Sequence, residues 1–133
     1  MSELRTDTIT ASDGTSPVTL TKQSAAKAYA NLNGSTFGLR KSLNITSAVD
    51  NGTGDYTFSF TSAMTDINYV STASISNDVS LTPQVIAVNN KSAGGYANVA
   101  PTTSQFRVSV VRASDGALAD GLYTNTSNHG DLA

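Results

Sequence analysis

Apolar and polar residues alternate through the middle of the chain. From Leu39 onward the period is two, and residues 43, 45, 47 and 49 form one face of a predicted strand. A loop follows at residues 50–54, and the next predicted strand places Tyr56, Phe58 and Phe60 on one face. An Asn-Gly pair between two alternating runs indicates a hairpin, because both central residues of such a turn must accept a positive φ. We therefore predict a β-hairpin here.

Further strands follow the hairpin. Residues 67–76 alternate weakly, residues 85–88 form a short apolar run that we expect to be well buried, and residues 105–112 place Phe106, Val108 and Val110 on one face. Residues 93–103 indicate a long loop, and Asp115-Gly116 indicates a turn. Residues 117–133 are mostly polar. Short strands separated by turns predict an all-β fold, an antiparallel β-sandwich that is jelly-roll-like and spans residues 24–133.

Two segments near the N-terminus are less regular. In residues 24–32, Ala25, Tyr29 and Leu32 have helical spacing, which slightly favours a short helix. Ala28, Ala30 and Leu32 alternate equally well, as in a half-buried strand. Residues 1–23 contain few large apolar side chains, so we expect an extended N-terminal arm there rather than a core element.

The composition changes the range of functions to consider. The chain has 133 residues, which fits one domain, and a third of them are Ser (18), Thr (18) or Asn (11). Charged residues make up only 14% and Glu occurs once, which argues against a helical bundle or a coiled coil. The net charge of -2 and eight scattered basic residues do not predict a nucleic-acid partner. No apolar run is long enough for membrane insertion, and there is no Cys.

Candidate chemistry is sparse. The loop at residues 50–55 has two carboxylates and an Asn amide, which are groups that calcium sites use. It lacks the spacing of an EF-hand, and its residue types fit a plain turn better. His129 is the only imidazole and has Asp131 nearby, yet no Gly-x-Ser-x-Gly motif supplies a nucleophile. The nine Asp residues and Glu3 lie mostly beside turn-forming residues. We expect no catalytic, cofactor-binding or metal-binding residue, and no enzymatic activity.

Two sets of polar residues suggest a surface. Tyrosines combined with abundant Asn and Thr could build a sugar-binding face, although most of them are expected at the edge of the core. These are Tyr29, Tyr56, Tyr69, Tyr96 and Tyr123. Asn-x-Ser/Thr triplets begin at Asn33, Asn44, Asn51, Asn90 and Asn125, and we interpret them as by-products of composition.

Four stretches of the chain carry a family resemblance. They are residues 24–34 (Ser-Ala-Ala-Lys-Ala-Tyr-Ala-Asn-Leu-Asn-Gly), residues 50–60 (Asp-Asn-Gly-Thr-Gly-Asp-Tyr-Thr-Phe-Ser-Phe), residues 64–69 and the terminal His-Gly-Asp-Leu-Ala of residues 129–133. Residues 4–9 add to it. Together they resemble the small β-rich tail-fibre and virion-surface proteins of tailed bacteriophages, over residues 20–76 and the last five.

The resemblance implies a homotrimer of β-sandwich domains, a virion location and no catalysis. It also implies a strand rather than a helix at residues 27–33. The function to expect is a non-enzymatic structural protein, a tail-fibre or receptor-binding component. It would attach to other virion proteins, of tail or capsid, through residues 1–23 and contact a host surface glycan through loops such as residues 93–103. Alternatives are a capsid decoration protein, since the chain has no long shaft, and a polysaccharide-binding or depolymerising module.

Overall fold

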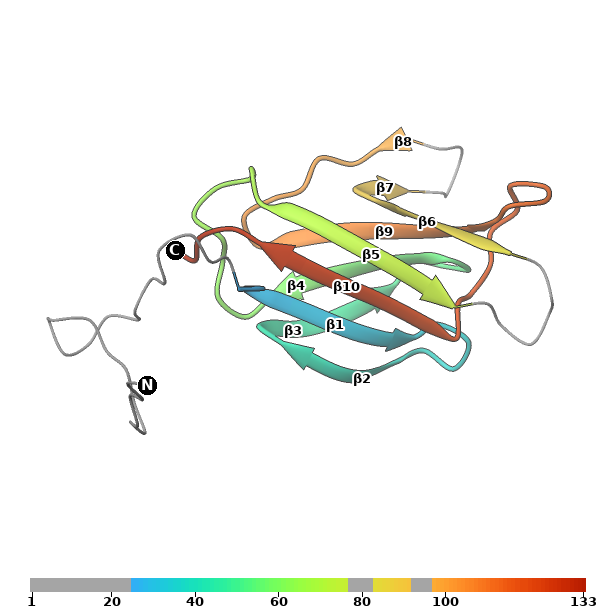
Figure 1. Cartoon of the computed structure of the whole chain (residues 1–133), viewed down its shortest axis with the longest axis horizontal. Helices are drawn as coiled ribbons and strands as arrows, with labels where there is room; N and C mark the ends of the chain where they lie inside the picture. The colour runs from blue at the N-terminus through green and yellow to red at the C-terminus, as the bar shows by residue number, and fades with distance from the viewer. Residues whose placement is uncertain (1–24, 77–82, 92–96) are drawn as a thin grey trace, which may run out of the picture.

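Two four-stranded antiparallel sheets dominate the computed structural model, which describes residues 25–76, 83–91 and 97–133 (Figure 1). The first sheet has the order β2 (Gly38–Leu43), β1 (Ala28–Asn33), β10 (Tyr123–His129) and β5 (Val70–Ser76). The second sheet has the order β3 (Ile45–Asp50), β4 (Asp55–Phe60), β9 (Gln105–Arg112) and β6 (Gln84–Val88). A two-stranded pair consists of β7 (Asn90–Lys91) and β8 (Ala97–Asn98). The all-β, antiparallel prediction is confirmed.

The strand order differs from a jelly roll, so that part of the prediction is wrong. β1 and β2 form a hairpin within the first sheet, and β3 and β4 form one within the second. The physical reason lies in tight turns that return the chain to its own sheet. The chain changes sheets between β2 and β3, at Asn44, which has φ 52°. Ser62 donates its backbone N–H to the Asn44 side-chain oxygen at 2.7 Å and stabilises this unusual conformation.

The β3–β4 hairpin is confirmed, with Asp50 opposite Tyr56 and Ala48 opposite Phe58. Two details differ from the prediction. The expected single strand face over residues 43–49 is interrupted by Asn44, and a bulge between Ile45 and Ser47 turns Val49 outward. Positive φ angles occur at Gly52 and Gly54 rather than at Asn51. A Cβ on Gly54 would lie 2.5 Å from the Val110 carbonyl oxygen, so this position also requires glycine for space.

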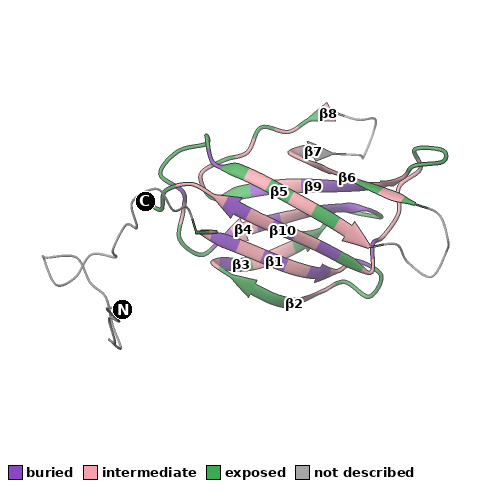
Figure 2. Cartoon of the chain, in the orientation of Figure 1, coloured by how far each residue is buried: buried purple, intermediate pink, exposed green. Residues whose placement is uncertain are grey.

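The core packs large aromatic residues of the second sheet against small and polar residues of the first. Buried positions occur on strands of both sheets (Figure 2). The rings of Phe58 and Phe106 are stacked with centroids 5.0 Å apart, and Phe60 meets Tyr69 edge-on at 5.4 Å. The buried residues of the second sheet are Ile45, Asp55, Tyr56, Phe58, Phe60, Phe106, Val108, Ser109 and Val110. Those of the first sheet are Ala28, Ala30, Leu32, Thr124, Thr126 and Asn128.

Strand β1 settles the ambiguity of residues 24–32. The short helix that the residues slightly favoured is wrong, and the strand alternative is correct. Ala28, Ala30 and Leu32 are buried in strict alternation with half-buried Tyr29 and Asn31. Tertiary packing overrides the helix propensity of alanine, because the period of two matches the sheet.

Strand β10 is the main element that the hydrophobic pattern missed. It lies between β1 and β5 in the middle of the first sheet, although residues 117–133 are mostly polar. Its core-facing residues are Thr124, Thr126 and Asn128, whose exposed fractions are 0%, 5% and 0%. The hydroxyls of Thr124 and Thr126 and the amide nitrogen of Asn128 lack a protein hydrogen-bond partner. A strand with a polar core face cannot be found by hydrophobic alternation.

This polar core face gives a testable prediction. Replacing Thr126 with valine should raise the free energy of unfolding by about 1 kcal/mol, because it removes a buried hydroxyl that has no partner. Urea denaturation measures this change. Thr72→Val on the outward face of β5 is the matched control and should have almost no effect. A destabilised Thr126→Val protein would show instead that the hydroxyl is hydrogen-bonded, for example to a buried water.

The remaining predictions have mixed outcomes. The strand at residues 105–112 is confirmed as β9, and the Asp115-Gly116 turn is confirmed with Gly116 at φ 68°. The third strand begins later than expected, at Val70, and Val85 of β6 is 51% exposed rather than well buried. The predicted arm at residues 1–23 and part of the predicted loop at residues 93–103 lie outside the described residues. Within the described residues, no helix has the length and hydropathy needed to cross a membrane.

Candidate functional site

The last five residues pack against the segment before β5. Thr65 donates its N–H to the Asp131 carbonyl oxygen at 2.8 Å, and Ala133 donates to the Ala63 carbonyl oxygen at 2.9 Å. Leu132 forms an isolated bridge with Met64. Residues 64–69 and residues 129–133 are therefore neighbours in the folded chain.

Exposed apolar side chains gather at this same end of the sandwich, which we call the terminal end. Val70 pairs with His129, and Leu43 pairs with Tyr29 near the start of β1. The start of β1 and the C-terminus lie at this end (Figure 1). The exposed side chains are Leu43 (48%), Ile67 (52%), Val70 (61%) and Leu132 (42%). Apolar side chains grouped in this way are typical of a surface that packs against another protein.

The end of the sandwich opposite the terminal end is stabilised by hydrogen bonds of the buried Tyr56 hydroxyl. Tyr56 donates its O–H to Asp120 Oδ1 at 2.6 Å, and Gly54 donates its N–H to the same oxygen at 2.7 Å. Burial raises the pKa of Tyr56, and its hydrogen bond to Asp120 raises this pKa further. A Cβ on Gly34 would collide with the Tyr56 hydroxyl. Asp120 therefore joins the connection between β9 and β10 to the β3–β4 hairpin, which is a structural role.

The loop at residues 50–55, whose carboxylates resemble those of a calcium site, also has a structural role. Arg107 donates to both carboxylate oxygens of Asp55, from Nε at 2.6 Å and from Nη2 at 2.8 Å. This hydrogen bond raises the pKa of Arg107. Asp50 accepts the Gly52 N–H at 2.9 Å, as in an ordinary turn. Because an arginine occupies the most buried carboxylate, the loop does not fit a cation site.

His129 does not belong to a triad. Its ring lies on the outer face of β10, where Nε2 is 3.1 Å from the Ser127 hydroxyl. Asp131 is exposed, and its carbonyl oxygen, rather than its carboxylate, is the atom bonded to Thr65. Across residues 25–76, 83–91 and 97–133, no three His, Cys, Asp or Glu side chains gather in a group that could hold a metal ion.

The tyrosines divide between the core and one surface. Tyr56 and Tyr69 are buried, and Tyr69 donates its hydroxyl to the Thr102 and Gln105 carbonyl oxygens, both at 3.0 Å. Tyr29 and Tyr123 lie on the outer face of the first sheet, and the Arg40 guanidinium covers the Tyr123 ring at 3.9 Å. Tyr96 lies outside the described residues.

Burial raises the pKa of Tyr69 to about 12, which predicts a loss of stability at high pH. A raised folded-state pKa means that the stabilisation is complete below about pH 10 and falls as the pH rises toward about 12, by about 2–3 kcal/mol in total. Urea denaturation from about pH 9 to about pH 12 measures the slope. The Tyr69→Phe variant should have a shallower slope, and an unchanged slope would contradict the assignment.

The outer face of the first sheet carries polar side chains in regular cross-strand rows. Two cross-strand rows define this polar face. One row is Lys41, Asn31, Asn125 and Ser74, and the other is Leu43, Tyr29, Ser127 and Thr72. Asn31 donates to Asn125 Oδ1 at 2.7 Å, and Asn125 donates to Ser74 Oγ at 3.4 Å. Neither row contains a carboxylate.

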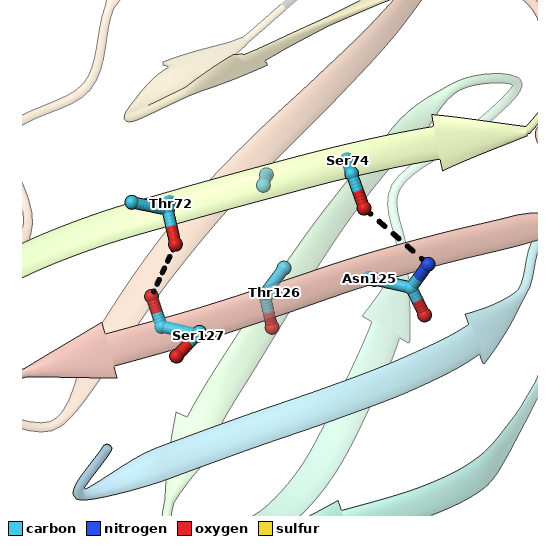
Figure 3. Close-up of a pocket in the computed structure, with 6 residues that line it drawn as sticks. Thr72, Ser74, Asn125, Thr126 and Ser127 are labelled. Atoms are coloured by element: carbon cyan, nitrogen blue, oxygen red, sulfur yellow. Dashed lines mark hydrogen bonds between the residues drawn. The ribbon is translucent and has the colours of Figure 1, made fainter. Parts of the chain in front are cut away.

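A shallow hollow of about 310 Å³ lies between β5 and β10 on this face (Figure 3). Thr72, Ser74, Asn125 and Ser127 contribute to its lining. Sequence reasoning missed this arrangement, because β10 was not recognised as a strand and its partner rows could not be assigned. The available signal was the alternation of Tyr123, Asn125, Ser127 and His129 with a second set of polar residues, Thr124, Thr126 and Asn128.

The Asn-x-Ser/Thr positions have local structural roles. Asn33 holds the β1–β2 turn by donating to Thr36 Oγ1 at 2.7 Å, and Asn44 makes the crossing between sheets. Asn51 donates to Thr57 Oγ1 at 2.9 Å, and Asn125 belongs to the polar face. The side chain of Asn90 lies outside the description.

No family model matches the chain, and neither a curated protein nor a solved structure matches it. A fold class alone does not determine a function, since one fold supports many. The function must therefore be argued from the two surfaces described above, the terminal end and the polar face.

Proposed function

We propose that the chain is a non-enzymatic structural protein of a tailed-bacteriophage virion, a tail-fibre or receptor-binding component. It attaches to the particle through residues 1–23 and turns the rest of the sandwich toward the host. The terminal end is the observation that carries this proposal. The exposed Leu43, Ile67, Val70 and Leu132 lie where the described chain enters the sandwich, so a segment that precedes residue 25 starts beside a surface suited to packing.

The carboxylates support a structural role over acid–base work. Asp55 is bound by Arg107, Asp120 is bound by Tyr56 and Gly54, and Asp50 and Asp66 accept backbone N–H groups within their own turns. A glycosidase needs two carboxyl groups that face each other across a substrate. The side chains named here are instead committed to holding loops in place.

The proposal includes a homotrimer. The apolar core is modest, because β10 presents Thr124, Thr126 and Asn128 to it. Covering exposed apolar side chains outside the terminal end, such as Val49 and Val85, with identical copies adds buried apolar area, at about 25 cal/mol per Å², and leaves the terminal end free for the particle. Closed symmetry is the usual arrangement when identical copies associate.

Deleting residues 1–23 tests the proposal. The shortened protein should remain a folded trimer, because none of the described strands includes these residues, and it should no longer join particles. Light scattering measures the oligomer, and mass spectrometry of purified particles measures incorporation. Normal incorporation of the shortened protein would overturn the assignment of the arm.

A capsid decoration protein is the second candidate, favoured because the described residues form a single sandwich without a shaft. Copy number per particle separates the two roles, since decoration requires a copy on many capsid positions and a tail fibre only a few. The polar face favours a third candidate, a polysaccharide-binding or depolymerising module. Reducing-sugar release that a single Asp substitution abolishes would favour the depolymerase.

A further inference from the structure

The geometry points to the polar face of the first sheet as a binding surface for an acidic polysaccharide. This inference rests on the proposed function, because it assigns the host contact to a particular surface and chemical class. Loops such as residues 93–103 were the expected contact from sequence. The polar face is instead built on the strands, whose backbone positions are held by the sheet.

The face offers regularly spaced groups that hydrogen-bond to hydroxyls. Neighbouring strands are about 4.8 Å apart, so the row from Lys41 to Ser74 spans about 14 Å across four strands. The amide of Asn125 and the hydroxyls of Ser74 and Thr72 can donate and accept, while Asn31 holds the Asn125 amide in place by donating to its oxygen. The second row adds the ring of Tyr29, which combines an apolar surface with a hydroxyl. Sugar rings present the same mixture of hydroxyls and C–H surface.

The charge of the face favours an acidic polymer. Lys41 is exposed at the β2 end of the first row, Arg40 lies beside it over Tyr123, and neither row contains Asp or Glu. An anionic chain would therefore meet positive charge and no carboxylate on the rows. The shallow hollow beside Asn125 does not enclose a small molecule, but an extended chain can lie along it.

A second copy of this chain fits the face less well. The cores of protein interfaces are enriched in aromatic residues and Met and depleted in Ser and Lys. The rows contain Ser74, Ser127, Lys41 and one aromatic ring, and their one large exposed aliphatic side chain, Leu43, lies at the edge that the polar face shares with the terminal end. The two surfaces therefore differ in chemistry, one suited to a polymer rich in hydroxyls and the other to protein.

Two variants test the inference with the full-length purified protein. Asn125→Ala removes the central amide, and Lys41→Glu reverses the charge at the end of the row. The probe is an immobilised panel of acidic polysaccharides bearing uronate, sialate or phosphate groups, with neutral dextran in parallel. We expect the unmodified protein to bind an acidic polysaccharide of the panel more tightly than dextran. Asn125→Ala should weaken that binding about 5–10-fold. Lys41→Glu should weaken it about tenfold at low salt, and by a smaller factor at high salt because salt screens the charge.

Matched controls lie on the second sheet. Gln105→Ala removes an exposed amide with one side-chain partner, Ser59, and Arg112→Glu makes the same change of charge beside Asp115. Both should bind as the unmodified protein does. The inference would be overturned if all four variants bound equally, or if the protein showed no preference for an acidic polysaccharide over dextran. It would also be overturned if Asn125→Ala caused an oligomer to dissociate, because a second copy of the chain would then occupy the face.

The outcomes also separate this inference from the proposed function. Normal incorporation into particles together with unchanged glycan binding by the face variants would remove the inference and leave the virion role standing. Glycan binding that depends on Asn125 and Lys41, in a protein absent from particles, would confirm the inference and remove the virion role.

Discussion

A chain that ends at Leu122 is expected not to fold. The truncation removes β10, which pairs with β1 along residues 124–128 and with β5 along residues 123–129. Without it, β1 and β5 present open edges to each other, and the aromatic residues of the second sheet lose the layer that covers them. The expected result is loss of the near-UV circular dichroism signal and of a cooperative urea transition.

A second truncation serves as the control for the first. Ending the chain at Asp131 removes the Leu132 bridge and the Ala133 hydrogen bond but keeps all of β10. This protein should fold, with a free energy of unfolding lowered by about 1–2 kcal/mol. If the chain ending at Leu122 still unfolds cooperatively, β10 is a peripheral strand that the fold does not require.

Replacing Arg107 with alanine should lower the free energy of unfolding by about 3 kcal/mol, measured by urea denaturation. The Asp55 side chain is only 2% exposed, and the substitution removes the guanidinium that contacts both of its oxygens. A carboxylate buried without its cation carries most of its desolvation cost. Native domains are stable by only about 5–15 kcal/mol, so this loss is large.

The double variant Asp55→Ala/Arg107→Ala distinguishes the cause. Removing both charges should be less destabilising than removing Arg107 alone, because no buried carboxylate remains. Arg112→Ala breaks the exposed pair with Asp115 at 3.1 Å and should change the free energy of unfolding by less than about 1 kcal/mol. An Arg107→Ala protein as stable as Arg112→Ala would contradict the structural role assigned to Asp55.

Much of the second sheet could be predicted from the sequence, and the reason is visible in its residues. Phe58, Phe60, Phe106, Val108 and Val110 alternate with polar residues, so hydrophobic periodicity finds β4 and β9 with nearly correct bounds. The hairpin turn was also predictable from its Asn-Gly pair. These elements bury large side chains, and large buried side chains are what such a pattern detects.

The first sheet was harder because its buried residues are small or polar. Ala28 and Ala30 resemble helix residues, and Thr124, Thr126 and Asn128 resemble a solvent-exposed tail. Their burial depends on the aromatic layer opposite, which is a tertiary property. The polar face could not be predicted for the same reason, since its rows exist only after β10 is placed between β1 and β5.

The terminal end and the polar face are consistent with one orientation of the protein on the proposed particle. The terminal end groups exposed apolar residues beside the point where residues 1–23 join the sandwich, while the polar face carries amides, hydroxyls and Lys41 without carboxylates. The shortage of charged residues, 14% of the chain, agrees with a surface that binds mostly by hydrogen bonds, with Lys41 and Arg40 adding the preference for an acidic polymer. In the proposed arrangement the first surface meets the particle and the second meets the host.

Electron cryo-microscopy of purified particles of a phage whose genome carries the gene for this chain, the source that the proposed function requires, tests the central claim most directly. The account predicts density for the β-sandwich on the particle in symmetric groups of three. It also predicts that the terminal end, marked by Val70 and Leu132, faces the virion and that the polar face is accessible from outside. Absence of the protein from the particles would contradict the virion role, and a terminal end that points away from the particle would contradict the mode of attachment.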